Sequence, residues 1–242
     1  MTERSERDDP LRIVFLVNAT SNKSRTTIDR FAEEWDVVDA SVACVVSSAS
    51  GTAAEAARSQ GYPTIVCSDS SEQEGAIERA TERIGGCDYL VSIGWTYLVP
   101  DEALEMPEQA ALNVHSSYLP AYKGLSVHRA QWANAERTGG VTVHRMTESF
   151  DAGRIVAQQR YRIGLFDTPI AMTNTIGALS AALVREAILK IEQGYEGEPQ
   201  PEEGNYYSLL PWSTVLQYGL VNHLYRALGS ESRFPVPTDD DD

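Results

Sequence analysis

The sequence has few cysteines, and their spacing excludes the usual cysteine-based sites. Its three cysteines, Cys44, Cys67 and Cys87, are far apart and form no C-x-x-C motif, and their odd number leaves at least one unpaired. Cys44 and Cys67 lie in apolar runs typical of strands. We therefore expect buried, reduced thiols rather than disulfides or metal ligands.

Long apolar runs and a secretory leader are also missing. No apolar run approaches the roughly 20 residues that a membrane-spanning helix needs. Residues 1–10 are polar and mixed in charge, unlike a signal peptide. Apolar residues still make up 42% of the chain, enough for a core. We expect a cytoplasmic protein with no membrane partner.

Lysine is scarce, whereas acidic residues are abundant. Only Lys23, Lys123 and Lys190 are lysines among 20 basic residues, and 35 acidic residues give a formal net charge of −15. No basic patch is visible that could neutralise phosphates, which argues against a nucleic-acid partner. An acid-rich, lysine-poor surface is typical of a high-salt cytoplasm, where screening reduces self-repulsion. We therefore expect a halophilic protein.

Apolar, strand-like runs alternate with segments of helical periodicity in the first half of the chain. Strands are expected at residues 12–17, 41–47, 64–67, 88–94 and 110–115, and helices at residues 26–35, 51–61 and 70–85. This alternation predicts the α/β class, with a Rossmann-like, mostly parallel sheet and flanking helices.

The pattern changes in the second half of the chain. A helix is expected at 125–137, an antiparallel strand pair at 141–146 and 154–163, a helix from Thr168-Pro169 to about Gly194, a linker at 196–205 and a helix at 212–228. The tail from Pro235 to Asp242 ends in four aspartates and is expected to be disordered. We predict a catalytic domain at 1–194 and a short helical C-terminal extension at 195–242.

The most informative segment ends the expected fifth strand, because parallel sheets bind ligands at the carboxyl ends of their strands. Period-two alternation places Asn113 and His115 on the same side of this strand. An amide and an imidazole can together hold an oxygen that gains charge and move a proton. Asp151 precedes Ala152-Gly153, and a turn there lets its carboxylate point back at the sheet. We predict a reaction centre formed by Asn113, His115 and Asp151.

Two other strand ends carry weaker signals. The loop after the first strand lacks glycine, which excludes the dinucleotide fingerprint and the nucleotide triphosphatase phosphate loop. Its Thr20, Ser21 and Asn22 could bind an anionic acceptor at the next helix start or simply form a capped turn. After the fourth strand, Trp95 and Tyr97 could line a pocket for a flat ring, although such aromatics more commonly belong to a core.

Three of the four histidines, His115, His128 and His144, fall within thirty residues. Their spacing matches no H-E-x-x-H pattern and no cysteine is near, so we expect no metal site. We interpret His128 as a helix residue with a polar partner and His144 as a half-buried strand residue.

The segment N-V-H-S-S-Y-L-P at 113–120, the following glycine and D-A-G at 151–153 after a V-T-V-H strand resemble the folate-dependent formyltransferases. That family includes glycinamide ribonucleotide formyltransferase, methionyl-tRNA formyltransferase and the sugar N-formyltransferases. Its signature, N-x-H-x-S-x-L-P followed by D-x-G, is complete here. The similarity covers about 12–194 in the order of elements and is strongest at 90–158.

The resemblance implies a role for each residue of the centre. Asn113 would bind the formyl oxygen, His115 would stabilise the tetrahedral intermediate and aid proton transfer, and Asp151 would order a water or relay the proton and hold His115 in its useful charge state. The co-substrate would be 10-formyltetrahydrofolate, without a metal. Its pterin would lie against two loops, with Gly94, Trp95, Thr96, Tyr97, Leu98, Met146, Thr147 and Glu148 as the binding candidates.

The implied acceptor is the primary amine of a small molecule. An oligomer is possible, and the oligomeric state of the protein is open. Residues 124–130 resemble the glycinamide ribonucleotide enzyme of purine biosynthesis, our best match. The glycine-free loop at 19–22 departs from that enzyme, however, and residues 204–211 resemble extensions of the sugar and other small-amine members. The C-terminal piece is too short and too acidic for a tRNA partner. Tyr206-Tyr207 is expected either to close over the site or to pack on the sheet.

Three other functions remain open. Formyltetrahydrofolate deformylase shares the Asn, His and Asp set but uses water, and it normally carries an N-terminal regulatory domain that we do not expect before residue 12. A folate-binding protein without turnover would not need all three groups. A dinucleotide enzyme is disfavoured by the missing glycines.

Overall fold

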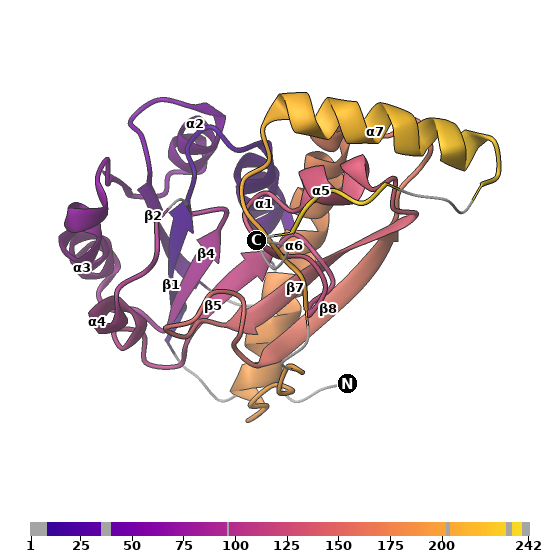
Figure 1. The fold of residues 1–242 in the computed structure, drawn as a ribbon. Coiled ribbons are helices and arrows are strands. Elements are labelled where there is room, and N and C mark those ends of the chain that lie inside the picture. Colours follow the sequence, from indigo (N-terminus) through magenta and orange to yellow (C-terminus); the bar gives the residue numbers. More distant parts are fainter. Residues whose placement is uncertain (1–8, 35–39, 96, 202–203, 231–233, 239–242) are drawn as a thin grey trace.

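The computed structural model describes residues 9–34, 40–95, 97–201, 204–230 and 234–238 (Figure 1). Its strands are β1 Leu11–Val17, β2 Ala40–Val46, β3 Thr64–Val66, β4 Tyr89–Ile93, β5 Ala110–His115, β6 Lys123–Gly124, β7 Thr138–Arg145, β8 Ile155–Arg162 and β9 Tyr206–Tyr207. Its helices are α1 Asn22–Glu34, α2 Thr52–Ser59, the 3₁₀ turn Ser70–Glu72, α3 Gln73–Ile84, α4 Asp101–Leu104, α5 His128–Ala133, α6 Pro169–Glu192 and α7 Trp212–Ala227.

Seven strands form one sheet in the order β3-β2-β1-β4-β5-β7-β8. The first five strands in the chain are parallel, and β7 and β8 are antiparallel additions at one edge. The predicted mostly parallel sheet with flanking helices is therefore confirmed. Because the strand order turns back between β1 and β4, the carboxyl ends of these strands open a crevice there.

Side-chain alternation along the central strands builds a core on each face of the sheet. On β1, Phe15 belongs to the cluster that packs against α1, α2 and α6, whereas Leu16 belongs to the cluster under α3. The rings of Phe15 and Phe31 meet edge to face at 4.9 Å. Cys44, Cys67 and Cys87 are all free and buried in these two clusters. The expected burial of the three thiols is confirmed.

The helix that we expected at 125–137 is much shorter, because α5 spans only His128–Ala133. Gly124 and Ser126 have φ angles of 102° and 49°, and Ala135 has a φ of 49°. Positive φ is incompatible with a right-handed helix, so the backbone on both sides of α5 departs from helical geometry. Residues 125–127 instead form an irregular segment between β6 and α5.

Helix α6 begins as its sequence predicts. Thr168 is the N-cap, and its hydroxyl oxygen accepts a hydrogen bond from the Ala171 amide at 3.1 Å. Pro169 occupies the first turn, where its missing N–H costs nothing. Among the helices of the described ranges, none is long and apolar enough to cross a membrane.

The C-terminal extension contacts the rest of the chain through the Glu198 bridge, strand β9, helix α7 and Val236. Glu198 forms an antiparallel bridge with Ile155, so the segment expected to be a linker is attached to β8. Strand β9 pairs in parallel with β6, and α7 lies over α5 (Figure 1). Val236 is buried, and its amide donates to Asn134 Oδ1 at 2.8 Å.

The first residues of the expected tail are therefore held in place rather than disordered, because Val236 joins the apolar cluster of α5 and α7. The four aspartates at 239–242 lie outside the described residues.

Candidate active site

A cavity of about 660 Å³ lies at the carboxyl ends of β1, β4 and β5. Its walls come from the segments after β1, β4 and β7, from the end of β5, from the residues around the start of α5, from the start of α6 and from the C-terminal extension. The lining residues include Asn18, 20–23, Gly94, Trp95, 97–99, 113–116, 124–129, Met146, Thr147, 149–151, Pro169, Ile170, Thr173, Leu209 and Trp212. The cavity thus occupies the position that the strand order predicts for a ligand site.

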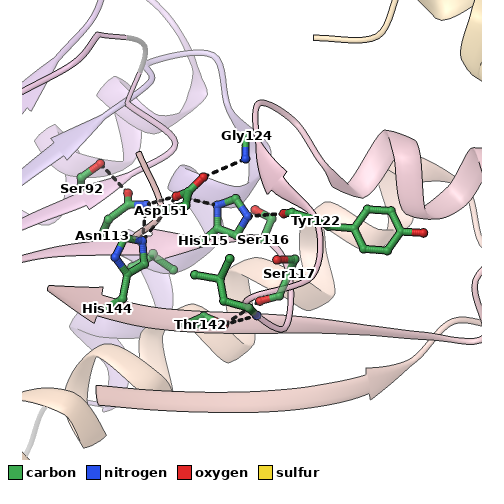
Figure 2. Close-up of polar contacts among 12 residues, drawn as sticks. Ser92, Asn113, His115, Ser116, Ser117, Tyr122, Gly124, Thr142, His144 and Asp151 are labelled. Carbon is green, nitrogen blue, oxygen red and sulfur yellow. Dashed lines mark hydrogen bonds and ion pairs between the residues drawn. The ribbon is translucent and has the colours of Figure 1, made fainter. Parts of the chain in front are cut away.

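Asn113, His115 and Asp151 meet in this cavity (Figure 2). Asn113 and His115 project from the same side of β5, as the alternation predicts. Asp151 reaches them from the β7–β8 connection, where it adopts a φ of 49°. Its Oδ1 lies 3.1 Å from His115 Nδ1 and 3.4 Å from Asn113 Nδ2. Gly153 permits this tight turn, because a Cβ there would lie 1.8 Å from the Arg145 carbonyl oxygen.

The same carboxylate is fixed by a main-chain group. The Gly124 amide donates to Asp151 Oδ2 at 2.8 Å. Burial by itself would raise the pKa of Asp151, but the charge and hydrogen bond of His115 and the hydrogen bond of His144 oppose it and hold the pKa well below its usual range. Asp151 is therefore a carboxylate at any pH near neutrality.

His144 is a member of this centre that the sequence did not reveal. Its Nε2 lies 3.1 Å from Asn113 Nδ2 and 3.4 Å from Asp151 Oδ1. Nδ1 lies 2.9 Å from the Arg145 carbonyl oxygen, which accepts its proton. We expected a half-buried strand residue, but the side chain is only about 3% exposed. The antiparallel register, which sets His144 opposite Asn113, brings it there.

Ser92 orients the Asn113 amide. The Ser92 hydroxyl donates to Asn113 Oδ1 at 2.9 Å (Figure 2). The amide oxygen is thereby turned toward β4, and the NH₂ group faces Asp151 and the cavity. This orientation presents Asn113 as a hydrogen-bond donor to a bound oxygen.

Both ring nitrogens of His115 face acceptors. Nδ1 faces Asp151, and Nε2 donates to the Tyr122 carbonyl oxygen at 2.7 Å. Only the doubly protonated imidazolium can donate to both. The arrangement therefore holds the His115 ring by an acceptor at each of its two nitrogens.

Lys23 is a further charged group of the cavity that the sequence did not indicate. Its Nζ donates to Ser116 Oγ at 2.9 Å, at the end of β5. Desolvation by burial lowers the pKa of Lys23 to about 8, although the charge of Asp151 acts in the opposite direction. The only signal for Lys23 in the sequence was the rarity of lysine itself.

His128 also lines the cavity. Desolvation and the charges of Lys23 and Arg129 lower the pKa of His128 to about 3, so His128 is neutral.

The structure places the folate-binding candidates unequally. Gly94, Trp95, Tyr97, Leu98, Met146 and Thr147 line the cavity. Trp95 also belongs to the core, where its indole N–H donates to Gln73 Oε1 at 2.8 Å. Glu148 lines a smaller neighbouring cavity instead, and Thr96 lies outside the described residues.

The candidate acceptor residues Thr20, Ser21 and Asn22 line the cavity at the start of α1. Ser21 Oγ accepts a hydrogen bond from the Ser24 amide at 3.2 Å, so this loop is also a capped turn. No group of three or more His, Cys, Asp or Glu side chains in the described ranges is arranged to hold a metal ion.

Comparison with known proteins identifies similar chains. The model of the formyl transferase family matches residues 11–188. GDP-perosamine N-formyltransferase from Brucella melitensis is 33% identical over 130 residues, which cover 53% of this chain and 50% of that protein. Methionyl-tRNA formyltransferase from Ralstonia pickettii is 34% identical over 124 residues, or 50% of this chain and 38% of that protein. The chain thus matches half or less of the length of these relatives.

Solved structures share the fold. Glycinamide ribonucleotide transformylase 1 from Symbiobacterium toebii superposes with a TM-score of 0.65 at 22% identity, covering 81% of this chain and 96% of that chain. A sugar 3N-formyl transferase, solved with dTDP and 5-N-formyl-THF, superposes with a TM-score of 0.60 at 15% identity, covering 91% of this chain and 81% of that chain.

Proposed function

This chain belongs to the formyl transferase family, and from that premise we propose that it transfers a formyl group from 10-formyltetrahydrofolate to the primary amine of a small acceptor. The observation that carries the proposal is the meeting of Asn113, His115 and Asp151 on the floor of one cavity. An amide donor, an imidazole that can move a proton and a buried carboxylate form the set that acyl transfer without a covalent enzyme intermediate requires.

The reaction follows from the positions of these groups. The acceptor nitrogen attacks the formyl carbon, a C–N bond forms, and negative charge builds on the formyl oxygen. The Asn113 NH₂ group, whose oxygen is held by Ser92, donates to that oxygen. The amine then loses a proton, N10 of the folate gains one, and the bond between N10 and the formyl carbon breaks, which releases tetrahydrofolate.

His115 is the group placed to move these protons. Its Nε2 proton is accepted by the Tyr122 carbonyl oxygen in this structure, and a bound formyl oxygen would compete for it. Asp151 orients the ring through Nδ1 and stays ionised itself. Fixed donors of this kind stabilise the transition state more than the ground state, which is the basis of the rate increase.

The folate ring system fits the side of the cavity formed by the 94–99 and 146–151 loops. The rings of Trp95 and Tyr97 lie edge to face at 5.4 Å there, and Met146 packs against the same cluster. Flat aromatic walls of this type suit a pterin.

The positive charges that line the cavity suit an acceptor that carries phosphate. Lys23 and Arg129 line the cavity although the chain as a whole is strongly acidic. Arg129 stacks over the Trp212 ring at 4.4 Å, and its buried Nε has no hydrogen-bond partner in the described part of the chain. A buried guanidinium nitrogen without an acceptor favours an anionic ligand.

Glycinamide ribonucleotide and a nucleotide-linked amino sugar both meet this requirement. Leu209 and Trp212 of the C-terminal extension line the cavity. The structural match to the sugar 3N-formyl transferase covers 91% of this chain, against 81% for the ribonucleotide enzyme. Together these two observations favour the amino sugar. The sequence of residues 124–130 favours the ribonucleotide.

The test is the conversion of 10-formyltetrahydrofolate to tetrahydrofolate by purified protein in molar potassium chloride. Separate reactions contain glycinamide ribonucleotide, a nucleotide-linked amino sugar, or no amine. Turnover that requires one acceptor supports transfer and identifies its class. Turnover without amine would identify a hydrolase, and folate binding without turnover under all conditions would overturn the proposal.

A further inference from the structure

We propose that strand β9 of the C-terminal extension, and Tyr207 in particular, positions the reaction centre. β9 would hold residues 122–125, here called the bracing segment, in the conformation in which their backbone fixes His115 and Asp151. The inference rests on the proposed function, because it assigns the extension a part in the same transfer reaction. Tyr207 is a positioning residue and does not contact the reacting atoms.

The bracing segment forms two main-chain hydrogen bonds with the centre. The Tyr122 carbonyl oxygen accepts from His115 Nε2 at 2.7 Å, and the Gly124 amide donates to Asp151 Oδ2 at 2.8 Å (Figure 2). Backbone groups cannot be reoriented by a side-chain rotation, so the geometry of the centre depends on the path of the chain through these residues.

That path is one the chain would not adopt unaided. Within the segment, Tyr122 has a φ angle of 59° and Gly124 a φ of 102°, and Ser126 directly after it has a φ of 49°. Non-glycine residues in this region cost free energy and persist only where the surrounding structure holds them. The holding contacts must therefore be found next to the segment.

Strand β9 supplies these contacts. The Lys123 amide donates to the Asn205 carbonyl oxygen at 2.9 Å, and the Leu125 amide donates to the Tyr207 carbonyl oxygen at 2.9 Å. The pair is so close that a Cβ on Gly124 would lie 2.2 Å from the Tyr207 carbonyl oxygen. Two main-chain hydrogen bonds thus flank the residue that binds Asp151.

The Tyr207 side chain adds a ring contact. Its ring stacks on that of Tyr122 with centroids 4.9 Å apart and planes 10° from parallel. Tyr207 is itself buried with Leu210, Val215 and Val236 against α5. The extension therefore clamps the bracing segment both by backbone pairing and by a stack against Tyr122, whose carbonyl meets His115.

The test compares Tyr207→Ala with Tyr218→Ala, a matched control. Tyr218 is a tyrosine of the same extension and packs on the same cluster, but it has no hydrogen bond to the bracing segment among the described contacts. We expect Tyr207→Ala to lower kcat by about tenfold to a hundredfold, as small misplacements of catalytic groups do, with a KM for 10-formyltetrahydrofolate within about threefold of the parent. Tyr218→Ala should keep kcat, and Tyr207→Phe, which keeps the ring stack, should recover most of the loss.

A second readout does not depend on turnover. In ¹⁵N-histidine NMR spectra, the His115 ring signals should shift in Tyr207→Ala and stay in place in Tyr218→Ala. If Tyr207→Ala does not fold, Tyr207→Leu keeps the apolar bulk without the ring and takes its place. Equal losses in the Tyr207 and Tyr218 variants, or unchanged His115 signals, would overturn the positioning role. An inactive parent protein with His115 signals that respond to Tyr207 would overturn the proposed function alone.

Discussion

Replacing Asp151 with asparagine isolates the charge of the carboxylate from its shape. Asp151 Oδ1 faces His115, His144 and Asn113, whereas Oδ2 accepts from the Gly124 amide. An asparagine must turn its NH₂ group toward one of these two sets of donors. Either orientation opposes a donor to a donor, and both remove the negative charge beside His115.

The size of the effect follows from the lost hydrogen bond. A hydrogen bond to a charged group contributes about 1.5–3 kcal/mol, and each 1.36 kcal/mol of barrier is about a tenfold change in rate. We therefore expect kcat of Asp151→Asn to fall by about tenfold to 150-fold. Asp101→Asn, at an exposed carboxylate on α4, is the control and should keep full activity. Initial rates of tetrahydrofolate formation under saturating substrates provide the comparison.

The pH dependence of stability gives an independent check on the same residue. Because the pKa of Asp151 is lowered in the folded state, its contribution to stability is present above the unfolded pKa of about 3.9 and is lost as the pH falls through the folded pKa. The difference in melting temperature between the parent and Asp151→Asn should thus be constant near neutrality and shrink in acid. Near-normal kcat in the variant, or a difference that grows in acid, would refute this account of the centre.

Further predictions concern the amide, the bracing segment and the surface. Asn113→Ala should lower kcat by about a hundredfold through lost oxyanion support; an increase in KM alone would show that the amide acts in binding. Gly124→Ala should destabilise the fold by about 2 kcal/mol or more in urea unfolding, because its φ is 102° and the Tyr207 carbonyl oxygen occupies the Cβ position; an unchanged midpoint would contradict the close approach. The melting temperature should rise from dilute buffer to molar potassium chloride, and equal curves would remove the salt-adapted interpretation.

The parts of the site that the sequence predicted are local or carried by a motif. Period-two alternation along a single strand was enough to put Asn113 and His115 on one side. Asp151 was predicted from the small residues that follow it and from the resemblance. No local sequence pattern indicates the direction in which its side chain points. The alternation of apolar runs likewise predicted the sheet and its flanking helices.

The parts that were missed depend on pairings between distant segments. His144 enters the centre because β7 pairs with β5 in one particular antiparallel register, and a shift of one residue would turn it away. Lys23 reaches Ser116 across 93 residues of sequence. The positive φ angles at Ser126 and Ala135 end the helix earlier on both sides than the sequence of 125–137 predicts. Strand pairing of two residues, as in β6 and β9, leaves no periodic signal.

Because all three cysteines are buried, their reaction with a thiol reagent can report on local unfolding of the sheet. Burial raises the pKa of Cys44 and of Cys87 to about 12, so neither thiol forms an appreciable thiolate in the closed molecule at neutral pH. Cys44 lies in β2 and Cys87 just before β4, both in the parallel half of the sheet. An alkylating reagent can therefore modify them only after these strands separate. The rate of alkylation then measures how often the sheet unfolds locally, without any engineered label.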